Sequence, residues 1–115
     1  ENIFHIIFDY DQPAGYSKII YDVGHPKIPH HNITKLERIY LLEAYCGSGA
    51  GSTLLNFNLR LSREKKQLGM WLYVWKENRR AIRFYQKNLF QIIGSHDFKL
   101  SETHSNPNYL MFLKY

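Results

Sequence analysis

The feature that most constrains this chain is a glycine-rich turn between an apolar segment and an amphipathic one. Residues 39–42 form a short apolar run that is typical of a buried strand. Gly47, Gly49 and Gly51 follow it, and apolar residues then recur at helical spacing. Such a turn leaves unpaired N–H groups at the positive end of a helix, and glycine lets an anion approach the backbone. The pattern therefore predicts a strand–turn–helix unit that can hold a phosphate group.

The spacing of the glycines separates this turn from two better-known phosphate motifs. It lacks the Gly-x-Gly-x-x-Gly pattern of dinucleotide sites, and no Lys follows Gly51 as a P-loop requires. Ser52 and Thr53 add hydroxyl donors at the start of the predicted helix. From these residues alone, an ordinary strand-to-helix turn remains the alternative.

Composition limits the chain to one folded domain. The 115 residues are 44% hydrophobic and 16% aromatic, which is enough for one packed core. No apolar run reaches the roughly 18 residues that a membrane-spanning helix needs, and no secretory signal pattern is present. The single Cys46 excludes an internal disulfide and suits a reducing compartment, so we expect a cytoplasmic protein.

A formal net charge of +5 and a sequence pI of about 9.4 favour an acidic partner. Nucleic acid is one candidate, and a ligand that carries phosphate groups is the other. The basic residues are divided between two predicted helices, and no zinc-finger, RNP or helix-turn-helix pattern accompanies them, which disfavours nucleic acid. We expect no metal site, because His30 and His31 would point apart on an extended backbone and no cysteine or carboxylate lies close by.

The rest of the chain predicts alternating strands and helices. Strands are expected at residues 2–10, 16–23, 34–42, 70–74, 90–98 and 109–113, with a turn at 11–15 that makes the first two a hairpin. One helix follows the glycine turn and is expected to end at Gly69, and a second runs from an Asn78 cap to about Asn88. The predicted fold class is therefore α/β (α+β), in the order βββ-α-β-α-ββ, with a mixed and mostly antiparallel sheet and helices on both faces.

A second motif lies downstream of the glycine turn. Asn78 is followed by Ala81-x-x-Phe84-Tyr85-x-Lys87 on the second predicted helix. With Cys46-x-x-Gly49-x-Gly51, this motif resembles the GNAT superfamily of acetyl-CoA-dependent N-acetyltransferases, whose loop pattern is Gln/Arg-x-x-Gly-x-Gly/Ala. The resemblance covers about two thirds of the chain, from Leu36 onward. Within the family, residues 36–40 and 96–98 look most like the bacterial spermidine/spermine-type acetyltransferases.

The resemblance implies acetyl-CoA as co-substrate. Backbone groups around Ile39, Tyr40 and Leu41 would pair with the pantetheine arm, and the N–H groups from Gly47 to Ser52 would hold the pyrophosphate. The cofactor-binding residues predicted in this way are Ile39, Tyr40, Leu41, Cys46, Gly47, Ser48, Gly49, Ala50, Gly51, Ser52, Asn78, Tyr85 and Lys87.

The resemblance also implies the reaction. Tyr85 is the expected general acid toward the leaving thiolate, and Glu37 is the candidate general base, with His96 or a water chain as alternatives. We expect direct acetyl transfer to a primary amine, either a polyamine-like small molecule or a protein amine. The alternative is an acyl-CoA-binding module of the same fold that does not catalyse transfer.

Three departures from the family pattern affect these expectations. Cys46 replaces the usual Gln or Arg, so binding at that position must depend on the backbone. Leu89 replaces the usual Gly before Phe90, and because a left-handed turn would strain Leu, we expect the helix to end differently. The usual N-terminal strand and two helices have no counterpart in residues 1–115, so this is a single GNAT-like domain without them.

The missing N-terminal elements matter for the first predicted strand. It is apolar at nearly every position, and an uncovered apolar edge is a template for aggregation. We therefore expect either that the chain forms a homodimer or that the natural protein has more residues before Glu1.

Overall fold

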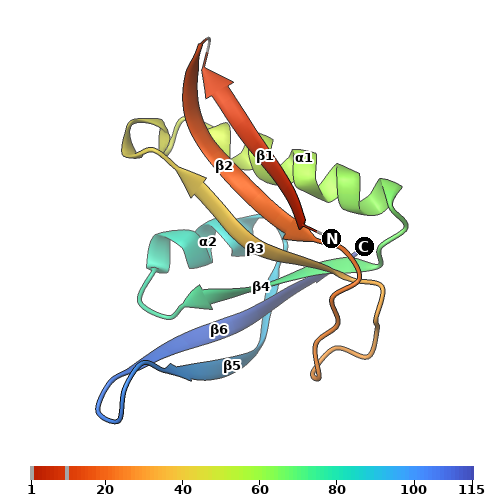
Figure 1. Ribbon diagram of the computed structural model, residues 1–115, viewed down its shortest axis with the longest axis vertical. Helices are drawn as coiled ribbons and strands as arrows, with labels where there is room; N and C mark the ends of the chain where they lie inside the picture. The colour runs from red at the N-terminus through yellow and green to blue at the C-terminus, as the bar shows by residue number, and fades with distance from the viewer. Residues whose placement is uncertain (1, 10) are drawn as a thin grey trace.

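A computed structural model describes residues 2–9 and 11–115. The elements, shown in Figure 1, are β1 (Asn2–Asp9), β2 (Gln12–Ile20), β3 (Thr34–Leu41), the 3-10 turn η1 (Glu43–Tyr45), α1 (Ala50–Glu64), β4 (Gly69–Trp75), α2 (Arg79–Lys87), β5 (Gln91–Lys99) and β6 (Ser105–Lys114). The predicted order of strands and helices is confirmed. Neither helix of the described chain is long and apolar enough to cross a membrane.

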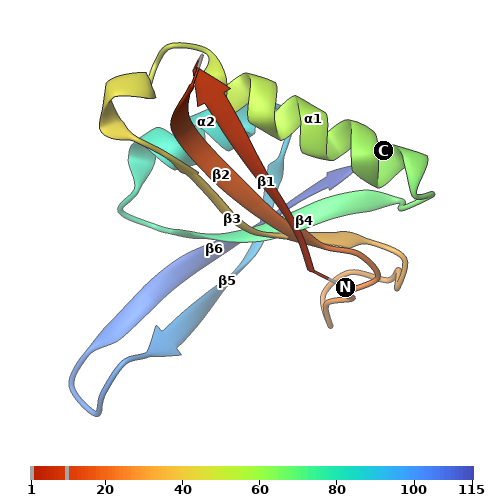
Figure 2. The ribbon, with the colours of Figure 1, turned by 45° about the horizontal axis from the view of Figure 1, so that its top comes forward.

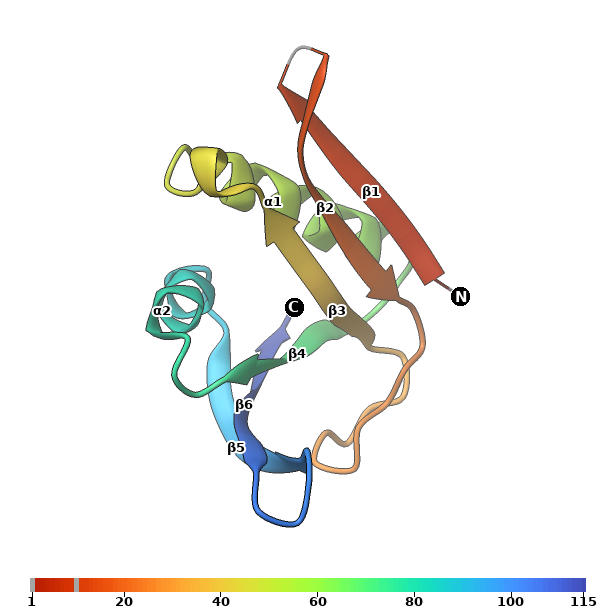
Figure 3. The same cartoon turned by 60° about the vertical axis from the view of Figure 1, so that its left-hand side comes forward.

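The six strands form one mixed sheet in the order β1-β2-β3-β4-β6-β5. Its one parallel pair is β3 with β4, because the chain crosses between them through α1. That pair is short: it joins Thr34 to Met70 and Lys35 to Trp71. Beyond these residues the two strands diverge, and α2 lies across the opening (Figure 3). The opening is where the candidate site is built.

Both helices pack against the same face of the sheet, as Figure 2 shows. Met70, Leu72 and Val74 alternate along β4 and share one buried cluster with Leu55 of α1 and Tyr85 of α2. The intervening Trp71 and Tyr73 point to the other face, where the segment from Val23 to Ile33 covers them. The expectation of helices on both faces is therefore wrong, since in residues 2–9 and 11–115 a loop and no helix covers the second face.

The segment between β2 and β3 is held by partly buried hydrogen bonds. Asp22 donates its N–H to Gln67 Oε1 at 3.0 Å, and Gln67 Nε2 donates back to Asp22 Oδ1 at 2.8 Å. Trp71 Nε1 donates to the Val23 carbonyl at 2.7 Å. These bonds fix the start of a segment that carries His25, which lies beside the candidate site.

Several element boundaries differ from the sequence-based expectation. β2 begins at Gln12, so Gly15 lies in a strand and not in the turn. A Cβ on Gly15 would lie 2.2 Å from the Tyr40 carbonyl oxygen, so glycine is needed there for close strand approach. α1 ends at Glu64 and the chain turns at Lys66 (φ 63°), which leaves Leu68 outside the helix and Gly69 as the first residue of β4. Tyr10, expected to end the first strand, lies outside the described residues.

The end of α2 also contradicts the prediction. Leu89 adopts the left-handed conformation (φ 74°) that was expected to be avoided. The reason is a Schellman motif, in which Leu89 N–H donates to the Gln86 carbonyl and Phe90 N–H to the Tyr85 carbonyl, both at 3.0 Å. Phe90 is buried and packs its ring against Tyr85, and this contact accompanies the strained backbone at Leu89.

Candidate active site

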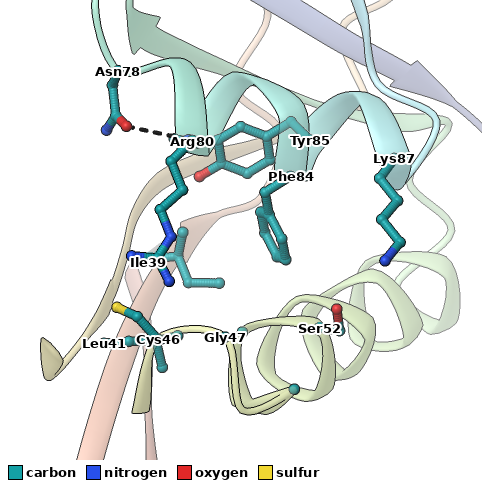
Figure 4. Close-up of a pocket in the computed structure, with 13 residues that line it drawn as sticks. Ile39, Leu41, Cys46, Gly47, Ser52, Asn78, Arg80, Phe84, Tyr85 and Lys87 are labelled. Atoms are coloured by element: carbon teal, nitrogen blue, oxygen red, sulfur yellow. Dashed lines mark hydrogen bonds between the residues drawn. The ribbon is translucent and has the colours of Figure 1, made fainter. Parts of the chain in front are cut away.

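A cavity of about 430 Å³ lies where the end of β3, the glycine turn and α2 meet (Figure 4). Its lining comes from segments that are distant in the sequence and that the β3–β4 opening brings together. The lining residues are Ile39, Leu41, Cys46, Gly47, Gly49, Gly51, Ser52, Asn78, Arg80, Ala81, Phe84, Tyr85 and Lys87.

The glycine turn presents the N-terminus of α1 to this cavity, and among the described residues only Ala50 N–H donates to a side chain there, to Ser48 Oγ at 3.4 Å. Gly47 and Gly49 have φ values of 83° and 93°, which favour glycine. Gly49 is the residue that precedes the helix, and it provides no side-chain cap. The first N–H groups of a helix lack intrahelical acceptors and lie at the positive end of its dipole. This end of the cavity is therefore suited to an anion.

Positive charge from α2 faces the same turn. Arg80 and Lys87 extend from α2 toward the turn and α1 in Figure 4, and both line the cavity. A Cβ on Gly47 would lie 3.6 Å from Arg80 Nη2, which places the guanidinium beside the turn. Within the described residues, the lining includes no carboxylate. A ligand with several phosphate groups matches this arrangement of charges.

The other wall of the cavity is apolar. Ile39 and Leu41 point to it from β3, and Phe84 points to it from α2. A Cβ on Gly51 would lie 3.2 Å from Leu41 and 3.5 Å from Phe84, so this glycine lets α1 approach both residues. The result is a slot that has charge at one end and hydrocarbon along its side.

A second cavity of about 230 Å³ fills the opening between β3 and β4. Tyr85 lines both cavities and therefore stands at their junction. Its side chain is 8% exposed, burial raises the pKa of its phenol, and the hydroxyl makes no hydrogen bond with the residues that the structure describes. Asn78, which also lines both cavities, caps α2 as predicted by accepting from Ala81 N–H at 3.1 Å.

Glu37, the candidate base, lines the second cavity from a bulge in β3. The strand register passes from Lys18–Arg38 to Ile19–Leu36, which leaves Glu37 without a partner on β2. Its carboxylate accepts from Lys18 Nζ at 3.4 Å. His96, the alternative base, is outside the lining of both cavities and packs its ring against Tyr73 and Phe98.

Ten of the thirteen predicted cofactor-binding residues line the first cavity, and Tyr40, Ser48 and Ala50 do not. Tyr40 faces the opposite side of the sheet because side chains alternate along β3, and the Ser48 hydroxyl donates to the Tyr45 carbonyl. The prediction missed Arg80, Ala81 and Phe84 as lining residues. Arg80 and Phe84 are recognisable from the sequence, since they precede Lys87 at helical spacing and so share its face.

The described part of the chain has no group of three or more His, Cys, Asp or Glu residues that is arranged to hold a metal ion. The candidate site is therefore built from backbone N–H groups, two cations, an apolar wall and a buried phenol.

Comparison with known proteins places this arrangement in a family. The profile of the acetyltransferase (GNAT) family matches residues 1–89. An uncharacterized N-acetyltransferase of Mycobacterium tuberculosis is 39% identical over 77 residues, which are 67% of this chain and 49% of that protein. The chain thus spans about half the length of this curated relative.

Two solved structures share the fold over nearly the whole chain. The PaiA N-acetyltransferase of Thermoplasma acidophilum, in complex with coenzyme A, has a TM-score of 0.75 and 25% identity over 99% of this chain and 61% of that one. A GNAT acetyltransferase of Streptococcus pneumoniae has a TM-score of 0.80 and 26% identity over 99% and 67%. Together with the family match over most of the sequence, these likenesses show that the chain belongs to the GNAT family of acetyltransferases.

Proposed function

We propose that this protein binds acetyl-CoA in the cavity between the glycine turn and α2 and transfers the acetyl group to a primary amine. The observation that carries the proposal is one continuous site. The N-terminus of α1, Arg80 and Lys87 match the phosphates, the apolar wall matches the pantetheine arm, and Tyr85 stands where the second cavity begins. The PaiA enzyme, which shares the fold, was solved with coenzyme A bound.

In the proposed reaction the amine nitrogen bonds to the acetyl carbonyl carbon and the carbon–sulfur bond breaks. Tyr85 gives its proton to the departing sulfur, and the proton that the amine loses passes through Glu37 or water and restores the phenol. Burial raises the pKa of Tyr85, so the phenol stays protonated until the thiolate forms beside it. Burial also makes the departing thiolate more basic than it is in water. This offsets the weaker acidity of the buried Tyr85 phenol.

The charges around the second cavity favour an acceptor with one amino group. Glu37 is the one carboxylate among its described lining residues, and it is already paired with Lys18. Arg38 lines the same cavity and repels further cations. We therefore infer that a protein amine or another monoamine fits this cavity better than a polyamine, which would need several acidic partners.

The first test is binding. A ligand of the native state raises its melting temperature, so we expect acetyl-CoA at millimolar concentration to stabilise the fold. Gly49→Ala should remove most of this shift because the left-handed turn strains alanine. Gly24→Ala is the matched control, since a Cβ there meets only ordinary contacts of 3.5 Å or more. No shift with the unmodified protein would contradict the proposal.

The second test is turnover. Free thiol is measured while acetyl-CoA is incubated with alkylamines, peptides and spermidine. We expect free thiol to be released only when an amine is present, and faster with monoamines than with spermidine. Acetyl-CoA binding without any release would instead support the alternative of a non-catalytic acyl-CoA-binding module. Salt-dependent DNA binding without acetyl-CoA binding would point to a nucleic-acid-binding protein.

A further inference from the structure

A histidine–tyrosine pair lies beside the second cavity and has no role in the reaction described above. His25 comes from the segment between β2 and β3, and Tyr73 comes from β4. His25 Nε2 and Tyr73 Oη are 2.6 Å apart. Tyr73 is also one of the residues that line the second cavity.

The proton between these two atoms can be assigned. Lys27 N–H donates to His25 Nδ1 at 3.0 Å, so Nδ1 is the ring nitrogen without a hydrogen. A neutral imidazole carries its one hydrogen on the other nitrogen, and Nε2 must therefore be the donor to Tyr73 Oη. The phenol keeps its own proton and one lone pair for another partner.

The surroundings hold both rings in place. His25 packs against Trp71 with ring centroids 4.9 Å apart, and Tyr73 meets Phe98 edge to face at 5.1 Å. The backbone just before His25 is fixed by the bond from Trp71 Nε1 to the Val23 carbonyl. The phenol oxygen is thus preorganised by a rigid donor.

Several other polar side chains that line the cavity already have a hydrogen-bond partner or a role in the proposed reaction. The Glu37 carboxylate accepts from Lys18, and the Arg38 guanidinium is a cation that donates to the Tyr16 hydroxyl at 3.3 Å. In the proposed function, Tyr85 already serves as the acid that protonates the departing sulfur. Resting on that function, we propose that Tyr73 accepts a hydrogen bond from the acceptor amine and so aims its lone pair at the acetyl carbonyl. His25 is the positioning residue that fixes the Tyr73 hydroxyl.

The experiment measures kcat and KM for the best monoamine, and separately the KM for acetyl-CoA. The variants are Tyr73→Phe, His25→Leu and His25→Gln, with His31→Leu as the control on the same segment. Phe keeps the ring contacts of Tyr73, and the Gln side-chain amide can still donate where Nε2 did. One hydrogen bond between neutral groups corresponds to about a 3- to 10-fold change.

We expect Tyr73→Phe and His25→Leu each to lower kcat/KM for the amine by about 3- to 10-fold while the KM for acetyl-CoA stays unchanged. His25→Gln should recover most of the loss, and the double variant should equal Tyr73→Phe alone because both changes act through one oxygen. An unchanged amine kcat/KM in Tyr73→Phe overturns the inference, as do additive losses in the double variant. A wild type that acetylates no amine overturns the proposed function as well, which separates the two failures.

Discussion

At the scale of residues, Tyr85 is suited to its proposed role by its position. The Schellman motif at the end of α2 ties the Tyr85 carbonyl to Phe90 N–H, and the two rings pack together. The side chain is thereby held where the two cavities meet. Nine tyrosines occur in the chain, and Tyr85 is the one that the Ala81-x-x-Phe84-Tyr85 motif singles out.

Replacing Tyr85 by Phe tests the general acid. We expect kcat to fall by about 10²- to 10⁴-fold, because proton transfer to the thiolate is lost while the ring is kept. Binding of acetyl-CoA, followed by its thermal shift, should change little. Tyr40→Phe is the control, since Tyr40 faces the other side of the sheet. Turnover by Tyr85→Phe equal to that of the control would remove Tyr85 from the mechanism.

His25 makes the stability of the fold depend on pH. Burial lowers the pKa of His25, and the nearby positive charges of Lys27, His96 and Lys35 lower it further. The folded protein therefore binds this proton less readily than the unfolded chain does. The stability that His25 contributes is fully present above the unfolded pKa of about 6.5 and is lost as the pH falls through the lowered folded pKa.

We expect the melting temperature of the wild type to fall more steeply below about pH 6.5 than that of His25→Gln, which cannot titrate. Melting curves recorded from about pH 7.5 to pH 5 measure the difference. His31→Gln provides the comparison for a histidine on the same segment. Parallel curves for the wild type and His25→Gln would show that His25 does not carry this pH dependence.

Several residues that line the cavity could be predicted from motif positions, whereas a contact between residues distant in the sequence could not. Gly49, Asn78 and Lys87 lie on the cavity because their motif positions share one turn or one helix face. Tyr40 was predicted through its backbone groups, and its side chain faces the opposite side of the sheet from the cavity. The His25–Tyr73 contact joins residues 48 positions apart, and no local pattern indicates it.

At the scale of elements, the end of α2 offers a stability test. Leu89 has a φ of 74° and is 74% exposed, so its side chain contributes little burial while its backbone is strained. Leu89→Gly should raise the free energy of unfolding by about 1 kcal/mol, because glycine adopts this conformation without a Cβ clash. Urea denaturation measures the change.

Gln86→Gly is the matched control for that variant. Gln86 is exposed and lies within α2, where glycine should lower the free energy of unfolding by about 0.5–1 kcal/mol. Opposite signs for the two variants are expected. A destabilised Leu89→Gly would mean that the left-handed turn does not strain the native chain.

The elements themselves were largely predictable, and their boundaries less so. The order of strands and helices followed from apolar periodicity and from the Asn78 cap. The expected turn at residues 11–15 was wrong because Gly15 serves close strand approach, and Gly69 failed as a helix stop because the chain already turns at Lys66. In each case glycine is needed because a Cβ would clash with a residue that is distant in the sequence, and the local sequence does not reveal that contact.

At the scale of the whole molecule, the sheet has one face without helices in the described residues. β1 lies at one edge of the sheet, and Phe4, Ile6 and Phe8 on its open face are 61%, 59% and 58% exposed. Phe4 and Ile6 line a hollow of about 480 Å³ together with Tyr16, Tyr40 and Leu42. Exposed apolar surface of this kind, beside an unpaired strand edge, favours association.

We predict that the 115-residue chain forms a two-fold dimer through β1 and this face. Sedimentation velocity should show an average mass that rises with concentration toward twice 13.7 kDa.

Ile6→Lys should give a monomer, since a charge on the open face of an edge strand opposes pairing. Its thermal shift with acetyl-CoA should be retained, because Ile6 lies outside both cavities of the site. Leu100→Lys is the control, because Leu100 is 69% exposed on the β5–β6 hairpin at the other edge of the sheet. A wild-type monomer at high concentration, with full acetyl transfer, would show that the open face needs no cover and that its apolar side chains are tolerated in water.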